Sequence, residues 1–175
     1  MPRIKTVYLV GPIEFLKNPD AGWRYDLAKE LKDKLNIESI NPVTISHLVG
    51  KDICDNMVFA ATLKKERRLS ELDQFINKKI WPINEKSVDD CDAIVTLAKT
   101  EEELKALSNS GGTIRELARA VDNQGKPAYL ICECEDLTPA NTHVLGLFLR
   151  NGAIFRSRSE LAEFLVRYNR SEEWI

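Results

Sequence analysis

Histidine, cysteine and long apolar runs are all scarce in this sequence. Its 175 residues include two histidines and four cysteines, and neither histidine has a partner at the spacing of metal ligands, so we expect no metal and no other cofactor. No apolar stretch approaches the ~20 residues that span a bilayer, and the first residues lead into a strand instead of a signal peptide. We therefore expect a cytoplasmic protein that has no membrane partner.

A surplus of positive charge is missing as well. The 25 basic and 27 acidic side chains give a net charge of −2, whereas proteins that bind DNA or RNA need an electropositive surface. This balance argues against polymeric nucleic acid as a partner. The 43% hydrophobic and 30% charged contents are typical of a globular protein, and the length fits a single domain over residues 1–175.

Strand-like and helix-like segments alternate along the chain. Short apolar runs predict strands, at residues 4–10, 37–40, 93–98, 128–132 and 153–155. Apolar positions in helical spacing predict helices, at residues 21–35, 63–80, 113–123 and 159–168, and the polar segment 99–110 is expected to be a loop. The alternation predicts an α/β fold with a flavodoxin-like or Rossmann-like parallel sheet of about five strands and helices on both faces. Ligands bind such sheets beyond the carboxyl ends of the strands, here the loops after Val10, Ala98 and Cys132.

A glycine-containing loop enters the helix predicted from residue 113. Ser110, Gly111, Gly112 and Thr113 form this loop. The glycines let backbone N–H groups approach a ligand, and a helix N-terminus favours a phosphate or a carboxylate. An ordinary helix start with Ser110 or Thr113 as its N-cap would use the same residues, so both interpretations stay open.

Glu116 lies just inside that helix. Beside a ligand held at the loop, its carboxylate is placed to act as a nucleophile or a base. Alternatively, it is a first-turn acid that complements the helix dipole and pairs with Arg119 or Lys126. The residue type alone does not decide between these roles.

Three segments have an order and spacing that point to a known family. They are Tyr8-Leu9-Val10-Gly11-Pro12-Ile13, Cys91-Asp92-Ala93-Ile94-Val95 and Ser110-x-Gly112-x-x-x-Glu116-Leu117-x-x-Ala120. Together they resemble the nucleoside 2-deoxyribosyltransferase-like family, which includes transferases and nucleotide N-glycoside hydrolases on a flavodoxin-like sheet. The resemblance implies an enzyme that cleaves or transfers the N-glycosidic bond of a nucleoside or nucleoside 5′-monophosphate. It also implies a homodimer or larger assembly, for which the apolar chain end Trp174-Ile175 is a second argument.

The resemblance assigns roles to several of these residues. Glu116 would attack the anomeric carbon of the sugar and form a glycosyl ester, and Tyr8 would orient that glutamate. The loop of Gly11, Pro12 and Ile13 would contact the substrate. A carboxylate suits the attacking role because it stabilises the positive charge of an oxocarbenium-like transition state before it bonds.

The general acid is where the sequence departs from the family. Family members often carry an aspartate at the position that matches Asn84, which is expected to contact the substrate, but an amide has no proton to transfer at neutral pH. Three alternatives remain: Glu85 acts after a one-residue shift, Asp92 acts, or the base leaves without acid catalysis. Asp92 is equally well explained as a turn residue that caps backbone groups.

Ser110 bears on the choice of substrate. In the family, members that act on free nucleosides tend to carry an acid at the matching position, and members that act on 5′-monophosphates carry serine. A serine hydroxyl can donate to a phosphate that an acid would repel. Glu14 argues against a monophosphate substrate, because phosphate-handling relatives often carry an arginine at the matching position and a glutamate has the opposite charge.

Two other functions stay open. Without an acid, the chain could be a non-catalytic nucleotide-binding or sensing module. The run Gly111-Gly112-Thr113-Ile114-Arg115-Glu116 also shares the G-G-T-x-x-E pattern of phosphoribohydrolases of the cytokinin-activating type. The proline and the third glycine of that family's longer motif are missing here.

Overall fold

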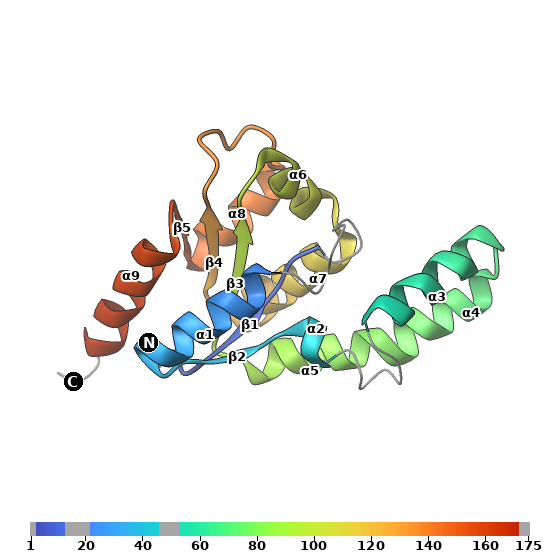
Figure 1. Cartoon of the computed structure of the whole chain (residues 1–175), viewed down its shortest axis with the longest axis horizontal. Coiled ribbons are helices and arrows are strands. Elements are labelled where there is room, and N and C mark those ends of the chain that lie inside the picture. The colour runs from blue at the N-terminus through green and yellow to red at the C-terminus, as the bar shows by residue number, and fades with distance from the viewer. Residues whose placement is uncertain (1–2, 13–21, 46–52, 172–175) are drawn as a thin grey trace.

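A five-stranded parallel sheet forms the centre of the protein (Figure 1). The structure is a computed structural model, and it describes residues 3–12, 22–45 and 53–171. The strands are β1 (Thr6–Leu9), β2 (Glu38–Ile40), β3 (Ala93–Ala98), β4 (Ala128–Cys132) and β5 (Ala153–Phe155). They lie in the order β2-β1-β3-β4-β5, and each neighbouring pair is parallel. This is the flavodoxin-like order, with a reversal of connectivity between β1 and β3, so the predicted fold class is confirmed.

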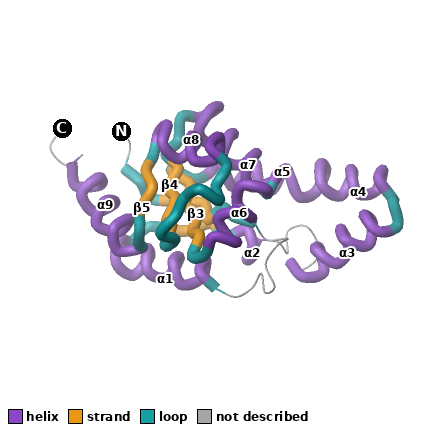
Figure 2. Tube along the Cα trace, turned by 90° about the horizontal axis from the view of Figure 1, so that it is seen from above, coloured by secondary structure: helices purple, strands orange, loops and turns teal. Residues whose placement is uncertain are grey.

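Helices cover both faces of the sheet, as Figure 2 shows. One face packs against α1 (Trp23–Leu35) and α9 (Arg158–Ser171), and the other against α5 (Trp81–Asp90), α6 (Glu101–Asn109), α7 (Gly111–Ala118) and α8 (Thr142–Asn151). On the first face, Leu27 and Leu31 of α1 share an apolar cluster with Leu161 and Leu165 of α9. All residues of β3 and β4 are buried, because strands covered on both faces need apolar side chains in both directions.

The segment 99–110, predicted to be a loop, is helix α6 instead. Thr100 is its N-cap, and the Thr100 side chain accepts a hydrogen bond from the N–H of Glu103. Leu104 and Leu107 anchor the helix in the core. Two buried apolar positions in a charged segment are too few to show a helical period, which is why the sequence pattern missed this helix. The prediction was right for the following helix, because α7 continues through the π-helical turn η3 (Arg119–Asn123).

A helical hairpin projects from the side of the sheet (Figures 1 and 2). It follows the short helix α2 (Pro42–Ile45) in the chain and consists of α3 (Ile53–Lys65) and α4 (Leu69–Phe75), after which a π-helical turn, η2 (Ile76–Ile80), leads directly into α5. The helix predicted over 63–80 is therefore wrong in its start, because Arg67 has a left-handed φ of 54° and separates α3 from α4. Within the described ranges, no helix has the length and apolar character needed to cross a membrane.

Candidate active site

A cavity opens at the carboxyl edge of the sheet, where the connectivity of β1 and β3 reverses. Its volume is about 360 Å³. Its polar side chains are those of Tyr8, Asn84, Asn109, Ser110, Thr113 and Glu116, its apolar side chains those of Pro42, Ile76, Ile80 and Trp81, and Gly11, Gly111 and Gly112 also line it. Segments that lie far apart in the sequence, including the first strand and the glycine loop, thus meet at one place.

Glu116 of α7 lines this cavity and is only 7% exposed. Its Oε1 accepts hydrogen bonds from the Tyr8 hydroxyl (3.2 Å) and from Nδ2 of Asn84 (2.7 Å). Burial raises the pKa of Glu116 to about 7, although the two hydrogen bonds and the charge of Arg24 act in the opposite direction. Near neutral pH, the side chain is therefore present both as an acid and as a carboxylate.

The alternative role of Glu116, as a surface acid of the first helical turn, does not fit the structure. Arg119 pairs with Asp89 at 2.8 Å. Lys126 donates from Nζ to the backbone carbonyls of Val88 and Asp89. Neither expected cation therefore pairs with Glu116, which is buried at the cavity.

Tyr8 reaches Glu116 from the sheet. It belongs to β1 and is buried in the cluster that packs against α5 to α8. Burial, and then the neighbouring Glu116, raise the pKa of Tyr8 well above its usual value. The hydroxyl therefore keeps its proton and donates it in a hydrogen bond. The contact predicted between Tyr8 and Glu116 is present.

Ser110 caps α7 from its place at the cavity. Its Oγ accepts hydrogen bonds from the N–H of Thr113 (3.4 Å) and from the Thr113 hydroxyl (3.0 Å). Gly111 and Gly112 form the first turn, whose amide N–H groups have no partner within the helix. A Cβ atom built on either glycine would meet nothing within 4 Å. The loop is thus a helix cap that also leaves open space beside its first amides, where an anion can approach.

Arg24 of α1 is a buried cation that the sequence pattern does not reveal. It is 3% exposed, and it donates from Nε to the Leu9 carbonyl (3.1 Å) and from Nη2 to the Gly11 carbonyl (2.9 Å). These bonds hold the chain at the end of β1. A Cβ atom on Gly11 would lie 2.9 Å from Nη2 of Arg24, so a larger residue would disturb this arrangement. Pro12 follows, and Ile13, also expected to bind substrate, lies outside the described residues.

Asp92, one candidate for the general acid, lies at the opposite edge of the sheet. It directly precedes β3, and its Oδ2 accepts hydrogen bonds from the backbone N–H groups of Lys5 and Thr6, both at 2.8 Å. This is the backbone-capping role that was the alternative for Asp92. The catalytic role expected of it is not supported, because the amino edge of β3 is remote from the cavity.

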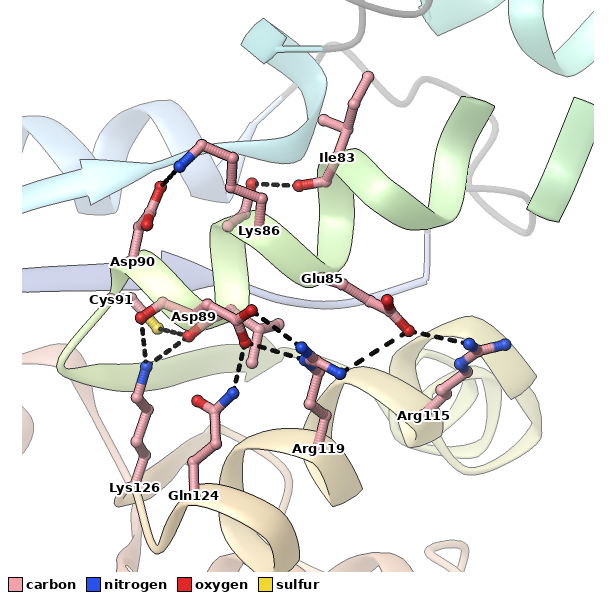
Figure 3. Close-up of polar contacts among 12 residues, drawn as sticks. Ile83, Glu85, Lys86, Asp89, Asp90, Cys91, Arg115, Arg119, Gln124 and Lys126 are labelled. Carbon is pink, nitrogen blue, oxygen red and sulfur yellow. Dashed lines mark hydrogen bonds and ion pairs between the residues drawn. The ribbon is translucent and has the colours of Figure 1, made fainter. Parts of the chain in front are cut away.

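Glu85, the other candidate, belongs to a row of ion pairs that joins α5 to α7 and η3 (Figure 3). It lies 2.8 Å from Arg115 and 3.9 Å from Arg119, and Asp89 accepts hydrogen bonds of 2.9 and 2.8 Å from Arg119. Glu85 is thus turned toward these arginines and does not line the cavity, so its expected role as acid is not supported either. The row instead joins α5 to α7 and η3, and so helps to hold Asn84 of α5 beside Glu116 of α7.

An apolar wall forms part of the cavity. It comes mainly from η2 and the start of α5, with Ile76, Ile80 and Trp81. Sequence patterns do not reveal a π turn, yet such turns occur frequently at functional sites. The guanidinium carbon of Arg115 lies 4.0 Å from the centroid of the Trp81 ring, which restricts the indole by a cation–π contact. The wall therefore includes one aromatic side chain held in place.

Charged groups are few at the cavity. Among the described residues that line it, Glu116 is the only acid, and none is Lys, Arg or His. Within the same described part of the chain, no three His, Cys, Asp or Glu side chains are grouped as metal ligands would be. The chemistry that these described lining residues offer is that of one carboxyl group, a few hydroxyls and side-chain amides, and the free backbone amides of a helix start.

Comparison with known proteins finds a similar fold but identifies no family. Neither a protein-family model nor a curated protein sequence matches the chain. Among solved structures, the chain is similar to that titled "Crystal structure of conserved protein from Enterococcus faecalis V583", with a TM-score of 0.61 and 16% sequence identity over 94% of this chain and 99% of that chain. At this identity the likeness concerns the fold alone, and it agrees with the α/β architecture described above.

Proposed function

We propose that the protein cleaves or transfers the N-glycosidic bond of a nucleoside or a nucleoside 5′-monophosphate, with Glu116 as the nucleophile. The observation that carries this proposal is the state of Glu116, a buried carboxyl group at a cavity whose Oε1 is held by Tyr8 and Asn84. Among the described residues, none donates to its other oxygen, Oε2. That oxygen is available to attack a ligand.

The chemistry follows from the position of this carboxylate. As the bond from the anomeric carbon to the base lengthens, positive charge develops on the sugar, and a carboxylate in a site of low dielectric stabilises that charge strongly. Bond formation then gives a glycosyl ester. Water or a second base attacks the ester and restores the Glu116 carboxylate.

The cavity also suits the two halves of a nucleoside. Its volume of about 360 Å³ lies within the range of roughly 300–1,000 Å³ that is usual for small-ligand pockets. The wall of Ile76, Ile80 and Trp81 can accept a planar base, while the hydroxyls and amides at Glu116 and the glycine loop can bind a sugar. A 5′-phosphate, where present, would lie at the start of α7.

Incubation with a panel of nucleosides and 5′-monophosphates, followed by chromatographic detection of free base, tests this proposal. The Glu116→Gln protein is the blank. Base release by the wild type alone supports the enzyme. Binding without release by either protein would instead support a nucleotide-binding or sensing module, the alternative that Asn84 favours because an amide transfers no proton.

Tyr8→Phe is expected to move the pH dependence of base release to higher pH. In the wild type, kcat/KM should rise through pH 7 as Glu116 ionises, since its pKa is about 7. The Tyr8 hydrogen bond lowers that pKa, so its loss leaves less carboxylate at any pH near neutrality. Pre-steady-state or steady-state rates from pH 5 to 9 measure the shift. Tyr129→Phe, which removes a hydroxyl in the aromatic cluster with Phe155 and Phe164, should leave the profile in place; an unshifted profile in both variants would contradict the orienting role of Tyr8.

Ser110→Asp is expected to weaken binding of a 5′-monophosphate at least tenfold, about 1.4 kcal/mol, and binding of the nucleoside much less. Aspartate is as good an N-cap as serine, so the helix start is kept while a charge is added where the phosphate would lie. Calorimetry in the Glu116→Gln background avoids turnover, and Ser110→Asn is the neutral control. Equal losses for both ligands would show that Ser110 holds the sugar, and the preference for monophosphates would be withdrawn.

We also propose that the active form is a homodimer or larger. The hairpin supports this, because Val58 and Leu69 are 67% and 66% exposed there and apolar side chains on a projecting element favour association. The chain end Trp174-Ile175, which gave the first argument, lies outside the described residues.

A further inference from the structure

Among the described residues that line the cavity, no side chain is an evident donor for the proton that a departing base normally needs. Among the described residues that line it, the titratable side chains are Tyr8 and Glu116. Glu116 is the nucleophile in the proposed function. Tyr8 is a poor acid, because burial raises its pKa well above the usual value, and its hydroxyl already donates to Glu116.

Asn84 of α5 lies beside Glu116 at the cavity. Its Nδ2 lies 2.7 Å from Oε1 of Glu116, and this bond fixes the amide with its NH₂ group toward the carboxylate. An amide cannot transfer a proton at neutral pH. Asn84 therefore positions the carboxylate of Glu116 but has no proton to give to a leaving base. Its remaining polar atom, the carbonyl oxygen Oδ1, is a hydrogen-bond acceptor.

The absence of an acid in this part of the cavity matters for some substrates and not for others. When a neutral base leaves, the electron pair of the broken bond stays on a ring nitrogen as negative charge, and a positioned acid accelerates that step by roughly 10²–10⁴. When the base already carries a formal positive charge, the same electron pair neutralises it. Such a base departs without a proton.

The electrostatics of the cavity agree with a cationic base. The one charged side chain among its described lining residues is Glu116, which is negative when ionised. The buried cation Arg24, whose charge lowers the pKa of Glu116, does not line the cavity and donates to the carbonyls of Leu9 and Gly11. A cation nearby favours the ionised form of a carboxyl group, and the attraction is strong where water is excluded. A positively charged substrate would therefore convert Glu116, whose pKa is about 7 in the free protein, into the carboxylate that must attack.

We propose, building on the glycosidic function above, that the substrate is a cationic N-glycoside: a nucleoside or nucleotide whose base is a pyridinium or an N7-alkylated purine. Oε2 of Glu116 forms a bond to the anomeric carbon while the bond from that carbon to the base nitrogen breaks. The electron pair moves to the base, which leaves as a neutral molecule. Water then attacks the anomeric carbon, loses its proton to solvent, and releases the sugar and the Glu116 carboxylate.

Matched pairs of probes test the charge requirement. Nicotinamide riboside and its dihydro form differ by one hydride and one charge, and 7-methylguanosine and guanosine differ by one methyl group and one charge. Base release is followed by chromatography, and the rate with the Glu116→Gln protein is subtracted to remove spontaneous hydrolysis. The wild type is expected to cleave the charged member of each pair at least about 10²-fold faster in kcat/KM, the contribution of a missing acid.

Charged nucleosides are also more labile in water, so a second measurement isolates the contribution of the protein. Asn84→Asp places two carboxyl groups at hydrogen-bond distance, where they share a proton because both cannot ionise together. That proton can be given to a neutral base. We expect Asn84→Asp to raise the cleavage of guanosine at least tenfold and to narrow the ratio between 7-methylguanosine and guanosine. Asn109→Asp also adds an acid at the cavity, but away from the Asn84–Glu116 contact, and should give no such gain.

The outcomes separate this inference from the function on which it rests. Comparable cleavage of guanosine and 7-methylguanosine by the wild type would overturn the inference and leave the glycosidic function standing. An Asn84→Asp protein that is folded, cleaves 7-methylguanosine and gains nothing on guanosine would also overturn it, since leaving-group protonation would then not depend on residue 84. Release of base from none of the four probes, nor from the wider panel, would overturn both.

Discussion

Replacing Glu116 with glutamine should abolish base release and, at the same time, stabilise the fold above pH 7. Glutamine keeps an oxygen that can accept the hydrogen bonds of Tyr8 and Asn84 but forms no glycosyl ester. Loss of a nucleophile commonly lowers the rate roughly a thousandfold or more. A variant that retained more than a tenth of the wild-type rate would exclude Glu116 as the nucleophile.

The gain in stability follows from the raised pKa of Glu116. The folded protein binds this proton with a pKa of about 7, against an ordinary value of 4.5. Between these two pH values the folded state holds more protons than the unfolded state, so the free energy of unfolding falls as the pH rises. Above pH 7 the buried carboxylate costs about 3 kcal/mol, the equivalent of that difference in pKa.

Urea unfolding at pH 5 and pH 8.5 measures this effect. The wild type and Glu116→Gln should be similar in stability at the lower pH, and the variant should be more stable by about 3 kcal/mol at the higher pH. Glu135→Gln removes the same charge at an exposed position and is the control for net charge. Equal pH dependence in all three proteins would mean that Glu116 ionises in the fold without penalty, and its burial would then have to be reconsidered.

Gly152→Ala is expected to destabilise the protein by about 4 kcal/mol or more, enough to prevent folding. Gly152 joins α8 to β5, and a Cβ atom there would lie 1.8 Å from the carbonyl oxygen of Ala128 and 2.7 Å from its carbonyl carbon. These are backbone atoms at the start of β4, a central element of the sheet. They cannot move aside without breaking the pairing of β4 with its neighbours.

Gly146→Ala is the matched control for this substitution. Gly146 lies in the middle of α8, and a Cβ atom there meets nothing within 4 Å. Alanine should stabilise that helix by about 0.5–1 kcal/mol. Thermal unfolding of both variants tests the pair. A Gly152→Ala protein with near-native stability would show that the chain between α8 and β5 approaches β4 less closely.

Strands were easier to predict from this sequence than the helices beside them. β3 and β4 are buried on both faces, so their residues form continuous apolar runs with clear ends. Helix α6 was missed because its two buried leucines follow a run of acidic residues. Helix α8 was not predicted at all. The helix predicted over 63–80 ran across the turn at Arg67, where the backbone reverses, because helical spacing continues there, and most of α3 was not predicted.

The candidate site was predictable to the extent that it consists of motifs. Tyr8, the loop 110–113 and Glu116 stand in sequence segments that resemble a known pattern, and they do share one cavity. Glu85 does not line the cavity because adjacent residues of a helix point in directions about 100° apart, so Asn84 reaches the cavity while Glu85 reaches Arg115. Asp92, the other candidate acid, binds backbone N–H groups at the amino end of β3. Arg24 was overlooked since an arginine on an amphipathic helix normally faces water, and only the fold shows the carbonyls that it binds.

In the proposed reaction, the formation of a glycosyl ester through Oε2 of Glu116 has a stereochemical consequence. With Tyr8 and Asn84 both on Oε1, the attack through Oε2 inverts the anomeric carbon once, and the water or base that resolves the ester must approach from the face that the first base has vacated. The second attack inverts the carbon again. In the proposed reaction, a β-nucleoside would thus give a product of β configuration, whereas a direct attack by water, with Glu116 as general base, would give the α anomer. Proton NMR of the sugar, recorded before it mutarotates, distinguishes the two.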